Sequence, residues 1–114
     1  MNDVTLLASS IPPFQFGFFV NSQVTGFAPN VGINGGGNLC LGGAIGRFIQ
    51  PGQIVNSGLD GEFSITLDLT GIPTPSNLVA VSAGDTWFFQ GWFRDTNANG
   101  SSSNLTNALG ITFN

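Results

Sequence analysis

The sequence predicts an all-β fold, an antiparallel two-sheet β-sandwich of jelly-roll or immunoglobulin-like type, with a barrel as the alternative. Apolar and polar residues alternate with a period of two along most of the 114 residues, and no window has helical periodicity. Turns rich in Gly, Pro and Asn separate short runs of this kind. Bulky residues on both faces of residues 86–94 favour the sandwich. The length fits one domain, residues 1–114, and no linker composition or internal repeat divides it.

The first third of the chain is expected to contain two strands, a continuation of the sheet and a loop. Residues 3–9 alternate as a first strand, which Pro12 and Pro13 end. A second strand at residues 14–20 has two faces, because successive side chains point to opposite sides. These faces carry Phe14, Phe16, Phe18 and Val20 on one side and Gln15, Gly17 and Phe19 on the other. Residues 23–27 continue the sheet, and residues 28–38 form a glycine-rich loop.

The middle third is expected to contain short strands separated by glycine turns. Residues 38–50 form a strand, a turn at Gly42-Gly43 and a second strand, and Pro51-Gly52 is a further turn. Residues 53–57 form a short strand before a turn at residues 58–61. Residues 62–69 alternate as a half-buried antiparallel strand. Its inward residues are Phe63, Ile65, Leu67 and Leu69, and its outward residues are Ser64, Thr66 and Asp68.

The last third is expected to contain three strands, at residues 78–82, 86–94 and 105–113. A proline-bearing connection at residues 71–77 precedes the first of them, and a turn at residues 83–85 follows it. A polar loop is expected at residues 95–104. The final strand is expected to place Leu109, Ile111 and Phe113 on one face.

The charge composition excludes two classes of partner. Only 7% of the residues are charged, and the cations are Arg47 and Arg94 alone. Two arginines with a net charge of −4 are too few to neutralise the phosphates of a nucleic acid or to bind anionic lipid. No apolar run has the length of a membrane span.

Composition also indicates where the protein works. The lysine-free surface, rich in Asn, Ser, Thr and Gly, is typical of an extracellular module. Residues 1–4 lack the basic segment of a secretory signal peptide, which leaves two interpretations: a mature or excised part of a longer secreted protein, or a cytosolic protein. The composition favours the first.

The residue types indicate a protein without catalytic, cofactor-binding or metal-binding residues. Histidine, lysine and tyrosine are absent and Cys40 is the single cysteine, which removes the commonest bases, nucleophile pairs and zinc ligands. A carboxylate pair is the remaining catalytic alternative. Its candidates are Asp60 with Glu62, or Asp68 with Asp85 or Asp95. Their positions at turns and on the polar face of a strand favour solvated surface residues.

Three further segments carry weak signals. Residues 95–100 fit the first half of a calcium loop, but Thr106 replaces the bidentate Glu at the twelfth position, so a turn is favoured. Gly35–Gly37 resemble a phosphate cradle, although no Lys-Ser/Thr pair follows. Residues 87–93 offer rings for stacking on sugars, while core packing of at least one face is favoured.

Cys40 cannot form a disulfide within this chain. A buried thiol is favoured, because free cysteine is among the most buried residue types. The alternative is a half-cystine whose partner lies outside the chain.

An ordered set of motifs carries a family resemblance. The set comprises N-L-C-L-G-G-A-I-G-R-F at residues 38–48, P-G-Q-I at residues 51–54, the strand at residues 63–69, and G-D-T-W-F-F-Q-G-W-F-R-D at residues 84–95. The chain resembles an uncharacterised β domain near the C-terminus of large secreted proteins of planctomycete-type bacteria. The resemblance implies an extracellular location and a β architecture, and no activity.

The same resemblance implies a missing edge strand. Similar sequences begin earlier, with a cysteine-containing strand that pairs with the cysteine equivalent to Cys40. An edge left open in this way would accept a partner strand or a second copy of the chain. The expected function is therefore a non-enzymatic extracellular structural, adhesive or display module. The alternative is a carbohydrate-binding module with exposed aromatic residues, and a carboxylate-pair hydrolase is a remote one.

Overall fold

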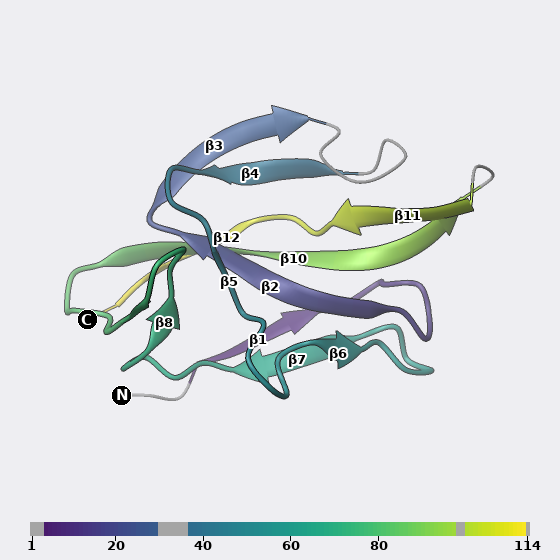
Figure 1. Ribbon diagram of the computed structural model, residues 1–114, viewed down its shortest axis with the longest axis horizontal. Coiled ribbons are helices and arrows are strands. Elements are labelled where there is room, and N and C mark those ends of the chain that lie inside the picture. The colour runs from purple at the N-terminus through teal and green to yellow at the C-terminus, as the bar shows by residue number, and fades with distance from the viewer. Residues whose placement is uncertain (1–3, 30–36, 98–99, 114) are drawn as a thin grey trace.

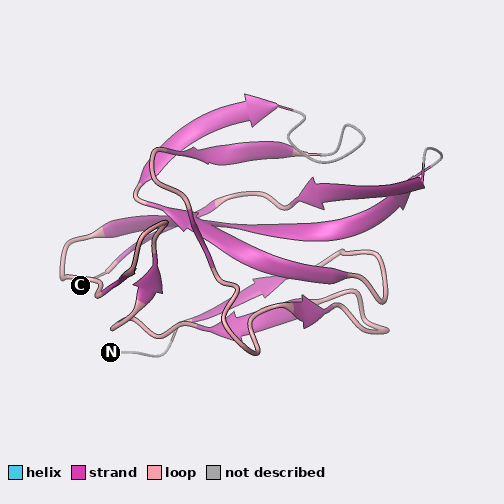
Figure 2. Cartoon of the chain, in the orientation of Figure 1, coloured by secondary structure: helices cyan, strands magenta, loops and turns pink. Residues whose placement is uncertain are grey.

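The computed structural model describes residues 4–29, 37–97 and 100–113, and within them the regular structure is entirely β (Figures 1 and 2). All strand pairs are antiparallel, and none of the described sheets closes into a barrel, so the sandwich is confirmed and the barrel alternative is wrong. The strands are β1 Thr5–Ala8, β2 Phe16–Ser22, β3 Val24–Pro29, β4 Asn38–Gly42, β5 Gly46–Arg47, β6 Val55–Asn56, β7 Phe63–Thr66, β8 Ile72–Pro73, β9 Leu78–Val79, β10 Thr86–Asn97, β11 Gly100–Leu105 and β12 Leu109–Thr112.

The main sheet is built around β10, its longest strand. β10 pairs with β2 on one side and with β11 and β12 in succession on the other, and β5 and β6 pair with the outer edge of β2. Trp92 lies opposite Leu105 and Phe89 opposite Leu109, so the partner strand has one extra residue between these two pairs. This irregularity is a bulge at residues 106–108, where the Thr106 N–H donates to the Gly91 carbonyl at 2.8 Å.

The hydrophobic core lies between one face of the main sheet and the β1–β7 pair. Trp87, Phe89 and Phe93 alternate along β10 and are buried on this face, and Phe19 of β2 contacts Phe63 of β7 with ring centroids 5.0 Å apart. The inward set predicted for residues 62–69 is confirmed, because Phe63, Ile65 and Leu67 are buried and Leu69 packs against the core. Burial of each such side chain contributes roughly 1.5–3 kcal/mol.

The β3–β4 hairpin lies on the opposite side of β10 and β2 from β1 and β7 (Figure 1). The side chain of Gln90 joins the two layers, because its Oε1 accepts the Cys40 N–H at 2.9 Å and its Nε2 donates to the Asn38 carbonyl at 2.7 Å. The amide thus takes the place that a neighbouring strand would occupy at this edge of β4.

The structure corrects three expectations from the sequence. Phe14 is outside the second strand, in a turn with a φ of 59° and with 62% of its surface exposed. The polar loop expected at residues 95–104 is instead the hairpin of β10 and β11, since polar strands hydrogen-bond to each other as readily as apolar ones. The single strand expected at residues 105–113 is divided by the bulge between β11 and β12.

Candidate functional site

The face of the main sheet opposite the core carries a group of aromatic rings. Phe16 and Phe18 alternate along β2 on this face, and Trp92 of β10 lies directly opposite Phe18 in the antiparallel register. The Phe18 and Trp92 rings are 5.0 Å apart at an interplanar angle of 36°. Phe16 is 55% exposed, and the other two are half-buried. We call these three residues the aromatic face; they form a tilted platform that water reaches.

A groove of about 360 Å³ runs beside the aromatic face. Phe18 and Trp92 form part of its lining, and the β4 residue Leu39 belongs to the opposite wall. Val20, Ile45, Arg47 and Leu105 complete the lining. A mostly apolar hollow with one charged side chain is the ordinary composition of a small-ligand site.

Both cations of the chain lie close to the aromatic face. Arg47 is part of its lining, and the guanidinium carbon of Arg94 lies 5.2 Å from the centre of the Trp92 ring. Both side chains are exposed, and among the described residues neither is paired with a carboxylate. One guanidinium group therefore belongs to a residue that lines the groove, and the other lies over the Trp92 ring of the aromatic face. Asp95 follows Arg94 in β10, and the side chains of residues 95–102 lie outside the described part of the structure.

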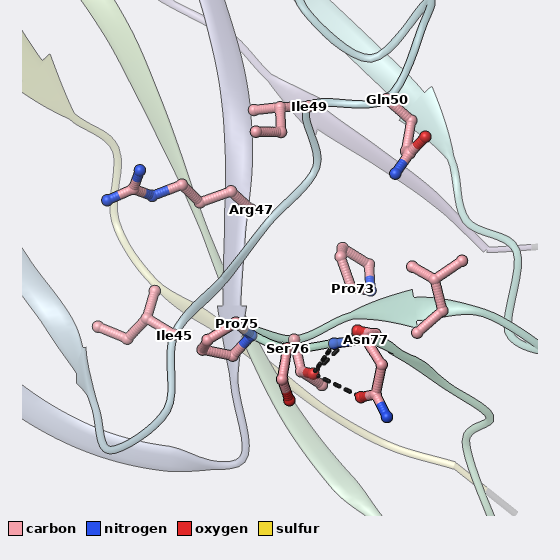
Figure 3. Close-up of a pocket in the computed structure, with 10 residues that line it drawn as sticks. Ile45, Arg47, Ile49, Gln50, Pro73, Pro75, Ser76 and Asn77 are labelled. Atoms are coloured by element: carbon pink, nitrogen blue, oxygen red, sulfur yellow. Dashed lines mark hydrogen bonds between the residues drawn. The ribbon is translucent and has the colours of Figure 1, made fainter.

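A second hollow of about 520 Å³ adjoins the groove, and Ile45 and Arg47 line both (Figure 3). The turn from Pro73 to Leu78 forms one wall. Figure 3 shows the guanidinium of Arg47 pointing away from Gln50 and Pro73. The turn is held by Thr74, whose N–H donates to the Asn77 carbonyl at 2.7 Å and whose Oγ1 accepts the Asn77 N–H at 3.1 Å. The two hollows form one surface that crosses the strands.

Of the five carboxylates predicted as a catalytic alternative, four lie in or beside turns and the fifth, Asp95, lies in β10. Asp60 and Glu62 are exposed and line a separate hollow beside β7. Asp68 accepts the Thr70 N–H at 3.0 Å, and Asp85 accepts the Ser82 N–H at 2.9 Å. Each of the last two carboxylates thus stabilises its own turn. The interpretation of Asp60, Glu62 and Asp68 as solvated surface residues agrees with their exposure.

The calcium-loop segment has a different backbone from the one that the motif requires. Residues 95–97 are extended and paired with residues 100–102, whereas a calcium loop curls around its ion. Thr106, at the twelfth position of the motif, uses its hydroxyl to accept the Gly91 N–H at 2.8 Å and to donate to the Asn107 carbonyl. No cluster of three or more metal-binding residue types occurs in the described part of the chain.

Cys40 is half-buried in β4, so the expectation of a buried thiol is wrong. It stays half-buried because β4 is covered by β3 on one edge and only by the Gln90 amide on the other. Pairing with a strand outside this chain stays a prediction. The glycine cradle proposed at residues 35–37 lies, except for Gly37, outside the described residues.

The groove includes residues that sequence reasoning did not select. Leu39 and Ile45 come from a segment noted only for its motif, and Phe18 was one of several phenylalanines in β2. The spacing of Phe16 and Phe18 predicts that the two rings share one face of their strand. Only the register with Trp92 identifies that face as the one outside the core.

Comparison of the chain with protein-family models, with curated proteins and with solved structures found no match. Within the described residues there is no helix with the length and apolar character needed to cross a membrane.

Proposed function

We propose that this chain is a non-enzymatic adhesive module of a secreted protein, and that it attaches its host to polysaccharide through the aromatic face. The observation that carries the proposal is the position of Phe16, Phe18 and Trp92 on the solvent side of the main sheet, next to a groove. One face of a pyranose ring consists of C–H groups, which the electron-rich face of an aromatic ring attracts. One exposed ring and two half-buried rings on one sheet face suit such a ligand.

The composition supports the non-enzymatic part of the proposal. A chain without imidazole, amine side chains or phenol has few groups that transfer protons near neutral pH. Asp68 and Asp85 are engaged in turns, away from the aromatic face. The shortage of charged residues and the resemblance of the ordered motifs support a secreted host protein.

Replacement of Trp92 by alanine is expected to lower the affinity for a bound polysaccharide about tenfold or more, because a central aromatic contact is lost. Affinity electrophoresis through gels that contain a panel of soluble polysaccharides measures the effect. The control is Phe27→Ala, which removes a ring that is 69% exposed on β3, outside the aromatic face. Equal retardation of the wild type and the Trp92→Ala variant would contradict the proposal, as would a wild type that no polysaccharide retards.

The two tryptophans allow a second readout of the same site. Trp87 is buried in the core with 3% of its surface exposed, whereas Trp92 is half-buried beside the groove. A polysaccharide on the aromatic face should therefore change the emission of Trp92 and leave that of Trp87 unchanged. The Trp87→Phe variant keeps the fluorescence response and the Trp92→Phe variant loses it. A response that is lost in Trp87→Phe and kept in Trp92→Phe would place the ligand elsewhere.

A further inference from the structure

We infer that the ligand is a single chain of an acidic polysaccharide, which crosses β5, β2 and β10 with Arg47 and Arg94 bound to its anionic groups. This inference rests on the proposed function and adds the chemical class of the ligand. Ligands of this class share an anionic group carried on a pyranose ring. A guanidinium binds such a group through paired N–H donors.

The distribution of charge favours an anionic ligand. The chain has two cations in 114 residues, and both are at the margins of one aromatic face. The described carboxylates are on other elements: Asp60 and Glu62 beside β7, Asp68 after β7, and Asp85 before β10. Asp95 follows Arg94 in β10, with its side chain outside the described residues, and Arg47 is the charged residue that lines the groove.

The distance between the two arginines favours a polymer. Arg47 lies opposite Val20, which lies opposite Gln90, and Arg94 is four residues further along β10. A rise of about 3.4 Å per residue and a strand spacing of about 4.8 Å place the two Cα atoms roughly 17 Å apart. This span exceeds one sugar ring. A polymer with repeated anionic groups can reach both arginines while its rings lie over Phe18 and Trp92.

The shape of the aromatic face favours a single soluble chain. The Phe18 and Trp92 rings are tilted by 36°, and the hollow beyond Arg47 continues the groove across the sheet. A flat crystalline polysaccharide needs coplanar rings, so the tilt favours a single soluble chain. An acidic peptide supplies the charge but has no flat C–H face to stack on the rings.

The test compares four polymers on the wild type by calorimetry: polygalacturonate, dextran sulfate, neutral dextran and polyglutamate. We expect binding of polygalacturonate or dextran sulfate, and the preferred one identifies the anionic group as carboxylate or sulfate. Raising the salt from 20 mM to 500 mM is expected to weaken this binding about tenfold, because exposed ion pairs are screened. Polyglutamate binding as tightly as the sugars would overturn the inference.

The Arg47→Gln and Arg94→Gln variants are each expected to lower the affinity for the acidic polysaccharide about fivefold, the range of an exposed ion pair. The control is Gln23→Glu, which makes the same change in net charge at an exposed position between β2 and β3. Affinity unchanged in both arginine variants, or lowered equally in the control, would overturn the inference. Binding of a neutral polysaccharide that needs Trp92 but neither arginine would overturn the inference alone, whereas no polysaccharide binding at all would overturn the proposed function too.

Discussion

Replacement of Gly46 by alanine is expected to destabilise the protein by about 3 kcal/mol, because the new methyl group would collide with backbone. A Cβ at this position would lie 1.9 Å from the Pro73 carbonyl oxygen and 3.0 Å from Nδ2 of Asn21. The Asn21 amide donates to that same carbonyl at 3.1 Å, so the strands must separate and a buried hydrogen bond is strained. For a domain of this size the melting temperature should fall by about 15 °C.

The matched control for this prediction is Gly71→Ala. A Cβ at Gly71 would be 3.6 Å from the nearest atom, a side-chain carbon of Leu78, which is an ordinary contact. Its effect on the free energy of unfolding should stay within about 0.5 kcal/mol. Urea denaturation of both variants measures the difference, and a Gly46→Ala variant that loses less than about 1 kcal/mol would contradict the close approach of β5 to Pro73. The separation of the strands would also affect the candidate site, since Arg47 follows Gly46 in β5.

Local alternation was sufficient to predict much of the core. In residues 62–69, apolar residues occupy one face and polar residues the other, so the buried side follows directly from the period of two. In residues 86–94 the same period separates Trp87 and Phe89 from Gln90 and Trp92, and the prediction that at least one face is core is confirmed.

Alternation could not say which aromatic residues meet water. β2 has phenylalanine on both faces, and only its pairing with β10 assigns Phe19 to the core and Phe18 to the groove. The groove itself needs Leu39 of β4, which reaches the sheet from a distant part of the sequence. Contacts of this kind depend on strand order, which the period of a single strand does not contain.

The role of Gln90 shows the same limit. In the sequence it is a polar residue among aromatic ones, and nothing there indicates its hydrogen-bond partners. In the structure it is 2% exposed, and its amide bonds to Cys40, to Asn38 and, at 2.6 Å, to the Thr106 carbonyl. These partners are 16 to 52 residues away. This buried amide, with three hydrogen bonds to backbone, holds both β4 and the bulge at Thr106 in place beside β10.

Replacement of Gln90 by methionine is therefore expected to destabilise the protein by about 3 kcal/mol, because one N–H and two carbonyl groups lose their partner while the volume is kept. The change should also weaken polysaccharide binding, since the amide holds β4, and with it Leu39, against the groove. Thermal melting and calorimetry on the same sample measure the two effects.

The control is Gln23→Met, which makes the same substitution at an exposed glutamine. It should leave both the melting temperature and the affinity unchanged. If Gln90→Met lowers the stability but leaves the affinity intact at a temperature where the variant is folded, the hairpin of β3 and β4 does not contribute a wall to the ligand site. Loss of both properties together would link the buried amide to the adhesive surface: a polar group buried between the main sheet and the β3–β4 hairpin would position the apolar wall of the site beside it.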